Sequence, residues 1–187
     1  MAPKVKITRE EIVKAAVEIV RHQGAATVNA RTVAGELNCS TQPVFSNFPT
    51  MEDLRVAVRE EAMKIYGAFL RRGREDNRFP AYKSEGMSYI RFAKEETELF
   101  KLLFMRDRDG EESDTEKASF TQIATEVQQL TGLDQDAASL FHLEMWSCVH
   151  GIATMFATNY LDLEWELVSQ MITHIYMGLR KQYGLEG

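Results

Sequence analysis

The chain has 187 residues, of which 44% are apolar, and a formal net charge of −6. This length and apolar content suffice for a buried core. The first residues lack the apolar segment of a signal peptide, and no stretch approaches the roughly 18 apolar residues of a membrane span. We therefore expect a soluble, cytoplasmic protein without a membrane partner. Cys39 and Cys148 form no C-x-x-C pair, so we expect reduced thiols and neither a disulfide framework nor a zinc ribbon.

The charge is distributed unevenly along the chain. Residues 1–50, here called the head, carry six Lys or Arg and four Glu, a net charge of +2. Residues 51–187, the body, carry 16 basic and 24 acidic side chains, a net charge of −8. Because contacts to phosphates make nucleic-acid binding strong, only the head is a candidate surface for DNA.

Apolar residues recur with the period of an α-helix almost throughout, which predicts an all-α fold of about nine helices. Thr8 and Glu11 have the spacing of a capping box, and Gly24 ends the first predicted helix. The apolar face of this helix consists of Ile12, Ala15, Ala16, Ile19 and Val20.

Two short helices are predicted next, which completes a three-helix bundle in the head. Asn29 is suited to cap the first of them, and Asn38 to the left-handed turn that ends it. Ser40 or Thr41 is expected to cap the second, which Pro49 ends. The buried positions of these two helices are Val33, Ala34 and Leu37, followed by Val44 and Phe48.

The body is predicted to be larger and entirely helical. Thr50 and Asp53 start a long helix that links it to the head, and Ser113 and Glu116 form a capping box after a polar loop at 106–114. The predicted helices of the body cover residues 51–74, 82–93, 99–105, 113–131, 136–160 and 163–183.

The strongest local signal is the segment that contains the two short helices. A short amphipathic helix, a four-residue turn and a second helix barely two turns long have the order of a helix-turn-helix. Its alternative is an ordinary three-helix packing unit with a polar turn. If it binds DNA, Ser40, Thr41, Gln42 and Pro43 are placed to reach base edges, because Gln pairs bidentately with adenine. The residues expected to hold phosphates are Lys4, Lys6, Arg31, Asn47 and Thr50.

Over residues 7–56 the chain resembles the TetR family of repressors. The resemblance rests on Gly24, Asn29, Arg31, Val33-Ala34, Leu37, Ser40-Thr41, Phe45, Phe48 and Glu52-x-Leu54. It implies a DNA-binding domain at residues 1–50, a ligand-binding and dimerisation domain at 51–187, and no enzymatic activity. Position by position, it implies that Asn29, Arg31, Thr41, Gln42, Pro43, Phe45 and Asn47 face DNA.

Three residues depart from the pattern of that family. Asn29 replaces a common Ser or Thr and caps a helix equally well. Phe45 replaces a common Tyr whose hydroxyl contacts phosphate, and Met51 replaces a common Lys. The last two changes predict a weaker grip on the DNA backbone, which the N-terminal arm with Lys4 and Lys6 would compensate.

Two clusters in the body, Phe100-x-x-x-Phe104-Met105 and Trp146-x-x-x-His150-Gly151, suggest a small-molecule effector. Trp146 and His150 lie one turn apart on one helix face, and with Gly151 they are similar to a TetR subgroup whose ligand domain carries this motif. The alternative for each aromatic or Met side chain is an ordinary core position, and for His150 a donor to a carbonyl group in the core. The expected lining of an apolar effector cavity is Tyr66, Met87, Phe100, Phe104, Trp146 and His150.

The penultimate predicted helix is apolar nearly all round, so one neighbouring helix does not cover it. We expect two copies of the last two helices to form a four-helix bundle in a homodimer, which two-fold symmetric operator DNA also requires. The alternative is that other helices of the same chain cover them. The predicted interface consists of Phe141, Met145, Val149, Ile152, Val168, Met171, Ile172, Ile175 and Leu179.

Catalysis is not indicated by any motif. None of the four histidines has a Glu three residues before it, and no phosphate-binding Gly loop or nucleophile motif occurs. The sequence therefore predicts a regulator, in the first place a repressor, that needs no cofactor or metal. It would bind double-stranded palindromic operator DNA as a homodimer and respond to a small, largely apolar effector. The alternative is a helical module that binds protein and not DNA.

Overall fold

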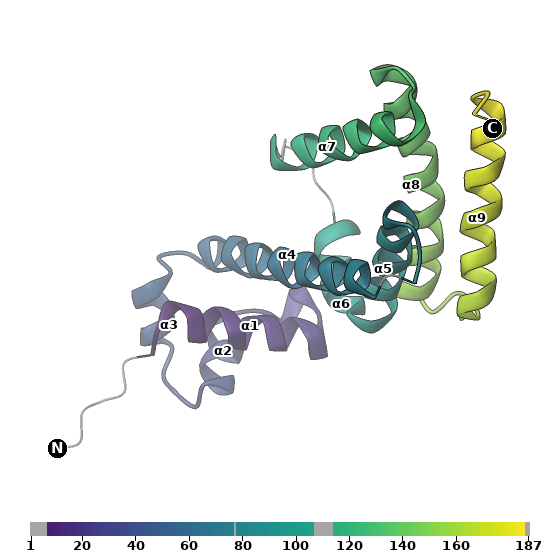
Figure 1. The fold of residues 1–187 in the computed structure, drawn as a ribbon. Coiled ribbons are helices and arrows are strands. Elements are labelled where there is room, and N and C mark those ends of the chain that lie inside the picture. The colour runs from purple at the N-terminus through teal and green to yellow at the C-terminus, as the bar shows by residue number, and fades with distance from the viewer. Residues whose placement is uncertain (1–6, 77, 107–113, 186–187) are drawn as a thin grey trace. The chain divides into compact units, whose positions relative to one another are not determined.

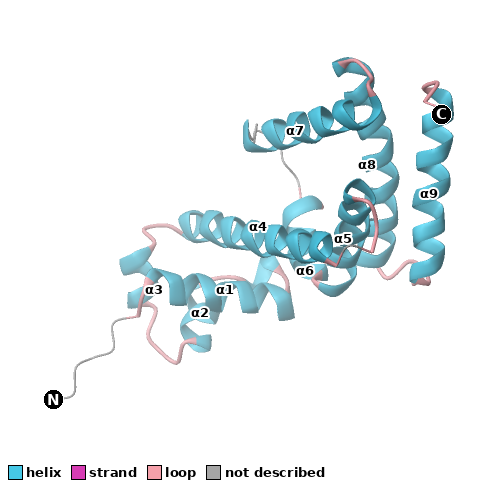
Figure 2. Ribbon diagram, viewed as in Figure 1, coloured by secondary structure: helices cyan, strands magenta, loops and turns pink. Residues whose placement is uncertain are grey.

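The computed structural model describes residues 7–76, 78–106 and 114–185, without the side chains of 114–120. In these ranges the chain forms nine α-helices and one short 3-10 helix, and no strand (Figures 1 and 2). This confirms the predicted all-α fold and its number of helices. None of the helices in the described ranges is long and apolar enough to cross a membrane.

The first two helices begin at the predicted caps. Helix α1 (Arg9–Gln23) starts with a complete capping box, in which Thr8 Oγ1 accepts from the Glu11 amide at 3.2 Å and Glu11 accepts from the Thr8 amide at 2.7 Å. Gly24 ends it with φ +83°, a conformation in which a side chain is strained. The 3-10 helix η1 (Ala25–Thr27), which the sequence did not indicate, leads to helix α2 (Ala30–Glu36), capped by Asn29.

Helix α3 (Gln42–Asn47) follows after a tight turn. Asn38 has φ +51°, so the predicted left-handed residue is confirmed. The prediction of a side-chain cap on α3 is wrong, because Thr41 at the cap position makes no capping hydrogen bond. Its backbone is already helical, with φ −71° and ψ −14°, whereas a capping side chain needs an extended backbone.

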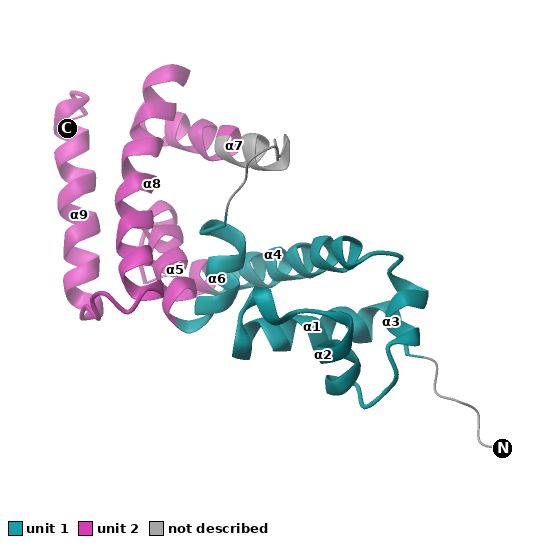
Figure 3. Cartoon of the chain, turned by 180° about the vertical axis from the view of Figure 1, so that it is seen from behind, with its two compact units in different colours: residues 1–72, 95–106 teal, residues 73–94, 107–187 magenta. Residues whose placement is uncertain are grey.

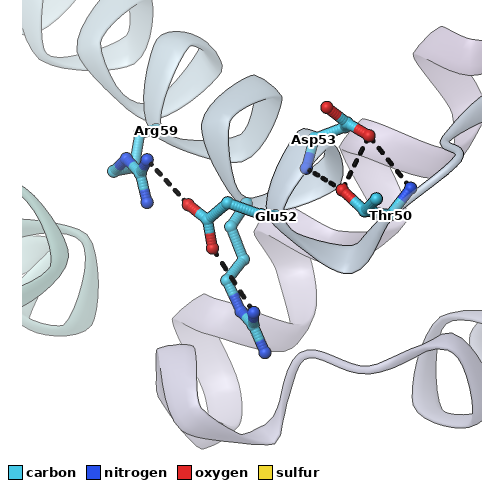
Figure 4. A network of polar contacts seen from close by, with 5 residues as sticks. Thr50, Glu52, Asp53 and Arg59 are labelled. Atoms are coloured by element: carbon cyan, nitrogen blue, oxygen red, sulfur yellow. Dashed lines mark hydrogen bonds and ion pairs between the residues drawn. The ribbon is translucent and has the colours of Figure 1, made fainter.

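Helix α4 (Met51–Glu75) begins at the predicted Thr50–Asp53 pair (Figure 4). Asp53 Oδ2 accepts from the Thr50 hydroxyl at 2.7 Å and from its amide at 2.9 Å, and the Asp53 amide donates back to Thr50 Oγ1 at 3.1 Å. These bonds, the side-chain one first, lower the pKa of the Asp53 carboxyl. Glu52 in the same turn forms ion pairs with Arg55 and Arg59.

The remaining helices agree with the prediction except at their ends. They are α5 (Ala81–Glu95), α6 (Thr97–Phe104), α7 (Asp114–Thr131), α8 (Gln135–Ala157) and α9 (Trp165–Gln182). The predicted end of α8 at Tyr160 was three residues too late, because Asn159 adopts the left-handed conformation with φ +53°. The predicted cap at Ser113 and Glu116 and the loop at 107–113 lie outside the described residues and side chains.

The chain folds into two compact units that do not coincide with head and body (Figure 3). Unit 1 comprises residues 1–72 and 95–106, so it contains the head, most of α4 and also α6. Unit 2 comprises residues 73–94 and 107–187, with α5, α7, α8 and α9. The functional division at residue 50 stays a prediction, since packing alone defines these units.

Each unit has its own apolar core. In unit 1, α1 to α4 and α6 contribute the fully buried Ile12, Ala16, Val20, Val33, Val44, Phe48, Leu54 and Leu99. In unit 2, α5, α8 and α9 contribute the fully buried Ile90, Phe92, Ala138, Phe141, Ala153 and Val168. The predicted buried stripe of the head is confirmed, except that Leu37 remains partly exposed.

Gly73, near the end of α4, lies in unusually close contact with α5 in unit 2. Its carbonyl oxygen accepts from Ser84 Oγ at 2.6 Å, and a Cβ on Gly73 would lie 1.8 Å from Ser88 Oγ and 3.0 Å from Ser88 Cβ. The Gly73→Ala variant should therefore lower the free energy of unfolding by about 1–3 kcal/mol, as overpacking does. Urea unfolding measures this change.

The matched control for this variant is Gly67→Ala in the same helix. A Cβ there would meet only Arg71 Nη1, at an ordinary 3.5 Å, so alanine should be neutral or stabilising. A second change, Ser88→Gly, should restore part of the stability that Gly73→Ala removes. Equal effects of the two alanine variants would contradict the close contact between α4 and α5.

Candidate functional site

The polar side of α3 faces away from the core of unit 1. Val44 and Phe48 are buried against the other helices of the head, whereas Ser40 and Gln42 are exposed and Phe45 has 51% of its surface accessible. Thr41 and Pro43 are half-buried at the start of the helix. The four side chains predicted to reach base edges thus lie at one exposed end of a helix whose opposite side is fixed by packing.

Three of the predicted DNA-facing polar side chains are already bound to the protein backbone. Asn29 Oδ1 accepts from the amides of Arg31 and Thr32 at 3.0 and 3.1 Å. Asn47 Nδ2 donates to the Pro43 carbonyl at 2.8 Å and, at 3.5 Å, to that of Ile7. The Thr50 hydroxyl is bonded within its capping box. These groups hold the helices of the head in place. Sequence patterns alone do not distinguish this structural role from contact with DNA.

Of the predicted phosphate-binding cations, Arg31 lies within the described residues. Arg31 is exposed in the first turn of α2. Lys4 and Lys6 lie outside the described residues. Arg9 was not predicted as a site residue; its guanidinium lies 4.7 Å from the centroid of the Phe48 ring, so it links the start of α1 to the end of α3.

The predicted effector residues are divided equally between the two units. In unit 1, the Tyr66 ring meets the edge of Phe104 at 5.1 Å between centroids, and Phe104 lies 5.2 Å from Phe100. Phe100 is fully buried, and burial raises the pKa of the Tyr66 hydroxyl. These three side chains form a contiguous aromatic cluster of α4 and α6.

The other three predicted effector residues lie in unit 2. The rings of Trp146 and His150 stack 4.9 Å apart on α8, and the Tyr89 hydroxyl of α5 lies 2.8 Å from His150 Nδ1. One partner of His150 is therefore the Tyr89 hydroxyl group, and a contact with a core carbonyl stays an alternative prediction. Trp146 keeps 41% of its surface accessible, and Met87 is buried.

A second His–Tyr pair between the same helices was not anticipated. The Tyr82 hydroxyl of α5 lies 3.1 Å from Nδ1 of His142 on α8, and the Tyr82 ring also faces Tyr176 of α9 at 6.2 Å. Burial lowers the pKa of His142 and raises that of Tyr82, because it penalises both charged forms. Both side chains are therefore neutral near pH 7.

The stability of the protein should consequently depend on the protonation of His142. Below the ordinary pKa of 6.5 the unfolded chain binds a proton that folded His142 does not take up until a lower pH. The unfolded state then binds more protons, so the free energy of unfolding decreases as pH falls through this window. Urea unfolding at pH 7.5 and 5.5 measures this loss, which His142→Gln should reduce.

The exposed His174 of α9 supplies the control for this measurement. His174→Gln should keep the pH dependence of the wild-type protein. If His142→Gln loses as much stability between the two pH values as the wild type, another group is responsible.

Six of the nine side chains predicted for the dimer interface are buried within the chain itself. Phe141, Met145, Val149, Ile152, Val168 and Ile172 each have 7% or less of their surface accessible. Other helices of the same chain cover them, so these six have no free surface for a second copy. Met171, Ile175 and Leu179 remain partly exposed. The apolar side chains of α8 and α9 that are most accessible include Leu140, Leu143, Leu167 and Met177.

Comparison with known proteins agrees with this architecture. Residues 84–175 match the model of the family described as "Tetracyclin repressor-like, C-terminal domain". A protein of Mycobacterium tuberculosis named as an uncharacterised HTH-type transcriptional regulator is 24% identical over 165 residues, which are 87% of this chain and 76% of that protein. The family consists of regulators, in agreement with the prediction that the chain is not an enzyme. From the all-helical fold and these similarities, residues 84–175 form a tetracyclin repressor-like C-terminal domain, in a chain that is distantly similar to an HTH-type transcriptional regulator.

Proposed function

We propose that the chain is a homodimeric repressor that binds palindromic operator DNA and is released from it by a small, largely apolar effector. The observation that carries the proposal is the exposed first turn of α3. A six-residue helix contributes little stability of its own, yet its buried side is fixed by Val44 and Phe48. Its outward side chains are thereby held in a defined direction, as groove readout requires.

The residues of the head divide into readers and positioning residues. Gln42 is proposed to read a base edge, with Ser40, Thr41 and Pro43 beside it. The exposed ring of Phe45 offers apolar surface to a thymine methyl group. Arg31 and the arm with Lys4 and Lys6 would contact phosphates. Asn29, Asn47 and Thr50 would act indirectly, because their polar groups hold the backbone.

The dimer is proposed to form from the α8 and α9 pairs of two copies. The accessible apolar side chains Leu140 and Leu143 are spaced along one side of α8, and Leu167 and Met177 are accessible on α9. A Cβ on Gly151 of α8 or on Gly178 of α9 would meet no other atom within 4 Å, so both helices have room for a close neighbour. Burying these side chains removes apolar surface from water, which stabilises the dimer.

The effector is proposed to act through aromatic side chains of the body and Met87. Tyr66, Phe100 and Phe104 in unit 1, and Met87, Trp146 and His150 in unit 2, are the candidates. Operator binding requires the two heads of the dimer to be spaced by roughly 34–36 Å, the distance between successive major grooves. An effector that binds better to a dimer with another head spacing therefore lowers operator affinity. The typical coupling free energy is about 1–3 kcal/mol.

Substitution of Gln42 tests the assignment of roles in the head. Gln42→Ala should relax base preference at one position of each half-site, whereas Lys6→Ala should weaken binding to all sequences alike. Sequencing the duplexes that each variant selects from a random pool measures preference, and fluorescence anisotropy measures affinity. Equal effects of both substitutions on preference would contradict the assignment.

A helical module that binds protein is the second candidate, because the accessible apolar side chains of α8 and α9 also suit a partner protein. A salt titration of binding to duplex DNA separates the two. DNA binding by the head predicts that log affinity falls linearly with log salt, at about 0.9 per phosphate neutralised. A flat response favours the protein-binding module.

A further inference from the structure

The chain passes from unit 2 to unit 1 between α5 and α6, and one residue joins these helices. Helix α5 ends at Glu95 and α6 starts at Thr97, so Glu96 alone is non-helical, with φ −121° and ψ 49°. Unit 2 ends at Lys94 on this side, and unit 1 resumes at Glu95. Any change in the direction of α6 relative to α5 must therefore occur at or next to Glu96.

The carboxylate of Glu96 is held by Arg21 in the last complete turn of α1. Arg21 Nε donates to Glu96 Oε2 and Nη2 donates to Glu96 Oε1, both at 2.9 Å, which is the two-pronged geometry of a strong Arg–carboxylate pair. Arg21 Nη1 also donates to Glu18 at 2.5 Å. Only 30% of the Arg21 side chain and 22% of the Glu96 side chain are accessible, so solvent screens this pair less than an exposed one.

The charge state of Arg21 is consistent with a tight pair. Burial by itself lowers the pKa of the guanidinium. The hydrogen bonds to Glu96 and Glu18 raise this pKa by more than burial lowers it, so the net shift is upward. The guanidinium is therefore permanently charged. Loss of Arg21 removes this partner from the partly buried Glu96 carboxylate, whereas loss of Glu96 leaves the guanidinium with Glu18.

On the other side of the joint, Lys94 is fixed within unit 2. Its ammonium group forms an ion pair with Asp162 and lies 5.1 Å from the ring centroid of Phe156 and 5.5 Å from that of Trp165. Lys94 and Glu96 are only two residues apart, and each forms a charged contact within its own unit. A single non-helical residue between two such contacts is the arrangement of a hinge.

Helix α6 is also attached to α4 at its other end. Phe104, the last residue of α6, meets the edge of Tyr66 on α4. The short α6 is therefore bound to α1 at its start, through Arg21 and Glu96, and to α4 at its end. Because α1 and α4 both contribute to the core of unit 1, a shift of α6 alters the packing of that core.

We propose that the Arg21–Glu96 pair is a clamp that fixes the joint between α5 and α6 to the DNA-binding helices, and thereby sets the affinity for operator DNA. This inference rests on the proposed function, because it assigns the clamp to the regulation of DNA binding. Arg21 and Glu96 are positioning residues in this account and do not touch DNA.

The test uses the full-length chain and a duplex that the wild-type protein has selected from a random pool. Arg21→Met, Glu96→Met and the double variant are compared by fluorescence anisotropy on this duplex and on a duplex of random sequence. We expect each single variant to bind the selected duplex about 5–10-fold more weakly, within the usual range of coupling between sites. The double variant should be no weaker than either single variant, since one contact is lost in all three.

Two comparisons separate a clamp from other roles. Arg21→Met removes a positive charge and Glu96→Met removes a negative one. If these charges acted only by attracting or repelling DNA, the first variant would bind DNA more weakly and the second more tightly. Such opposite changes in DNA affinity would overturn the proposal. Equal weakening on the random duplex would also overturn it, because it indicates a general loss of the folded head. The control variant Glu18→Gln leaves the two bonds between Arg21 and Glu96 in place and should bind as the wild type does.

Failure of the proposed function has a separate signature. If the wild-type protein selects no duplex, DNA binding itself is refuted. Hydrogen exchange of the amides of residues 97–104 then tests the clamp alone. Faster exchange in both single variants than in Glu18→Gln supports a clamp on α6, and unchanged exchange overturns it.

Discussion

Replacement of Phe48 by alanine is expected to unfold the head and abolish DNA binding. Phe48 lies at the end of α3 with 1% of its surface accessible, and the centroid of its ring lies 4.7 Å from the guanidinium of Arg9. Truncation of a buried Phe costs about 3–5 kcal/mol, which is a large part of the stability of a small domain. Urea unfolding should show a transition of the head at lower denaturant, while unit 2 keeps its helical signal.

Phe45→Ala is the matched control, since Phe45 lies three residues earlier with 51% of its surface accessible. This variant should retain the stability of the wild type and lose only DNA affinity. If Phe48→Ala leaves both stability and DNA binding intact, the packing of α3 on the head is wrong.

A charged pair of substitutions on the accessible side of α8 and α9 is expected to dissociate the dimer. Leu143→Glu with Leu167→Glu places four carboxylates in the proposed four-helix bundle, where burial of a charge is costly. Operator affinity should fall by about a hundredfold or more, because two linked heads gain that much over one. Sedimentation velocity measures the oligomeric state.

The control is Leu130→Glu on α7, because this side chain is 62% accessible and lies outside α8 and α9. It should remain a dimer with the operator affinity of the wild type. A dimer that persists in the Leu143→Glu, Leu167→Glu variant would show that another surface joins the two copies.

Most of the fold could be predicted because its signals are local. Capping boxes at Thr8 and Thr50, the Asn29 cap and the left-handed Asn38 act within four residues, so the sequence displays them directly. The prediction of a side-chain cap on α3 was wrong because capping depends on the backbone conformation of Thr41, which residue type does not determine.

Long-range contacts account for what the sequence did not reveal. Arg21 and Glu96 are 75 residues apart, so nothing in their local pattern indicates that α6 packs with α1 in unit 1. The prediction of the dimer interface was limited in the same way. Because α8 is apolar on several sides, periodicity predicts that it is covered by two neighbours and does not say which side its own chain covers. The accessible Leu143 and the buried Met145 are therefore equivalent in sequence terms.

In the candidate site, residue types predicted exposure better than role. Gln42 and Phe45 are exposed as expected, since the buried Val44 and Phe48 fix the orientation of α3. Asn47 was expected to hold phosphate, but its amide group bonds to the Pro43 carbonyl, one turn away. An amide side chain serves either purpose, and only the backbone geometry around it decides between them.

The most direct test of the account is the sequence of the duplexes that the full-length protein selects from a random pool. If α3 enters successive major grooves from a two-fold symmetric dimer, the selected duplexes should share an inverted repeat with half-site centres about 10 base pairs apart, or a multiple of that. The preference within each half-site should change in the Gln42→Ala variant. Selection of no common sequence, or of a single asymmetric site that Gln42→Ala selects equally well, would contradict the central claim.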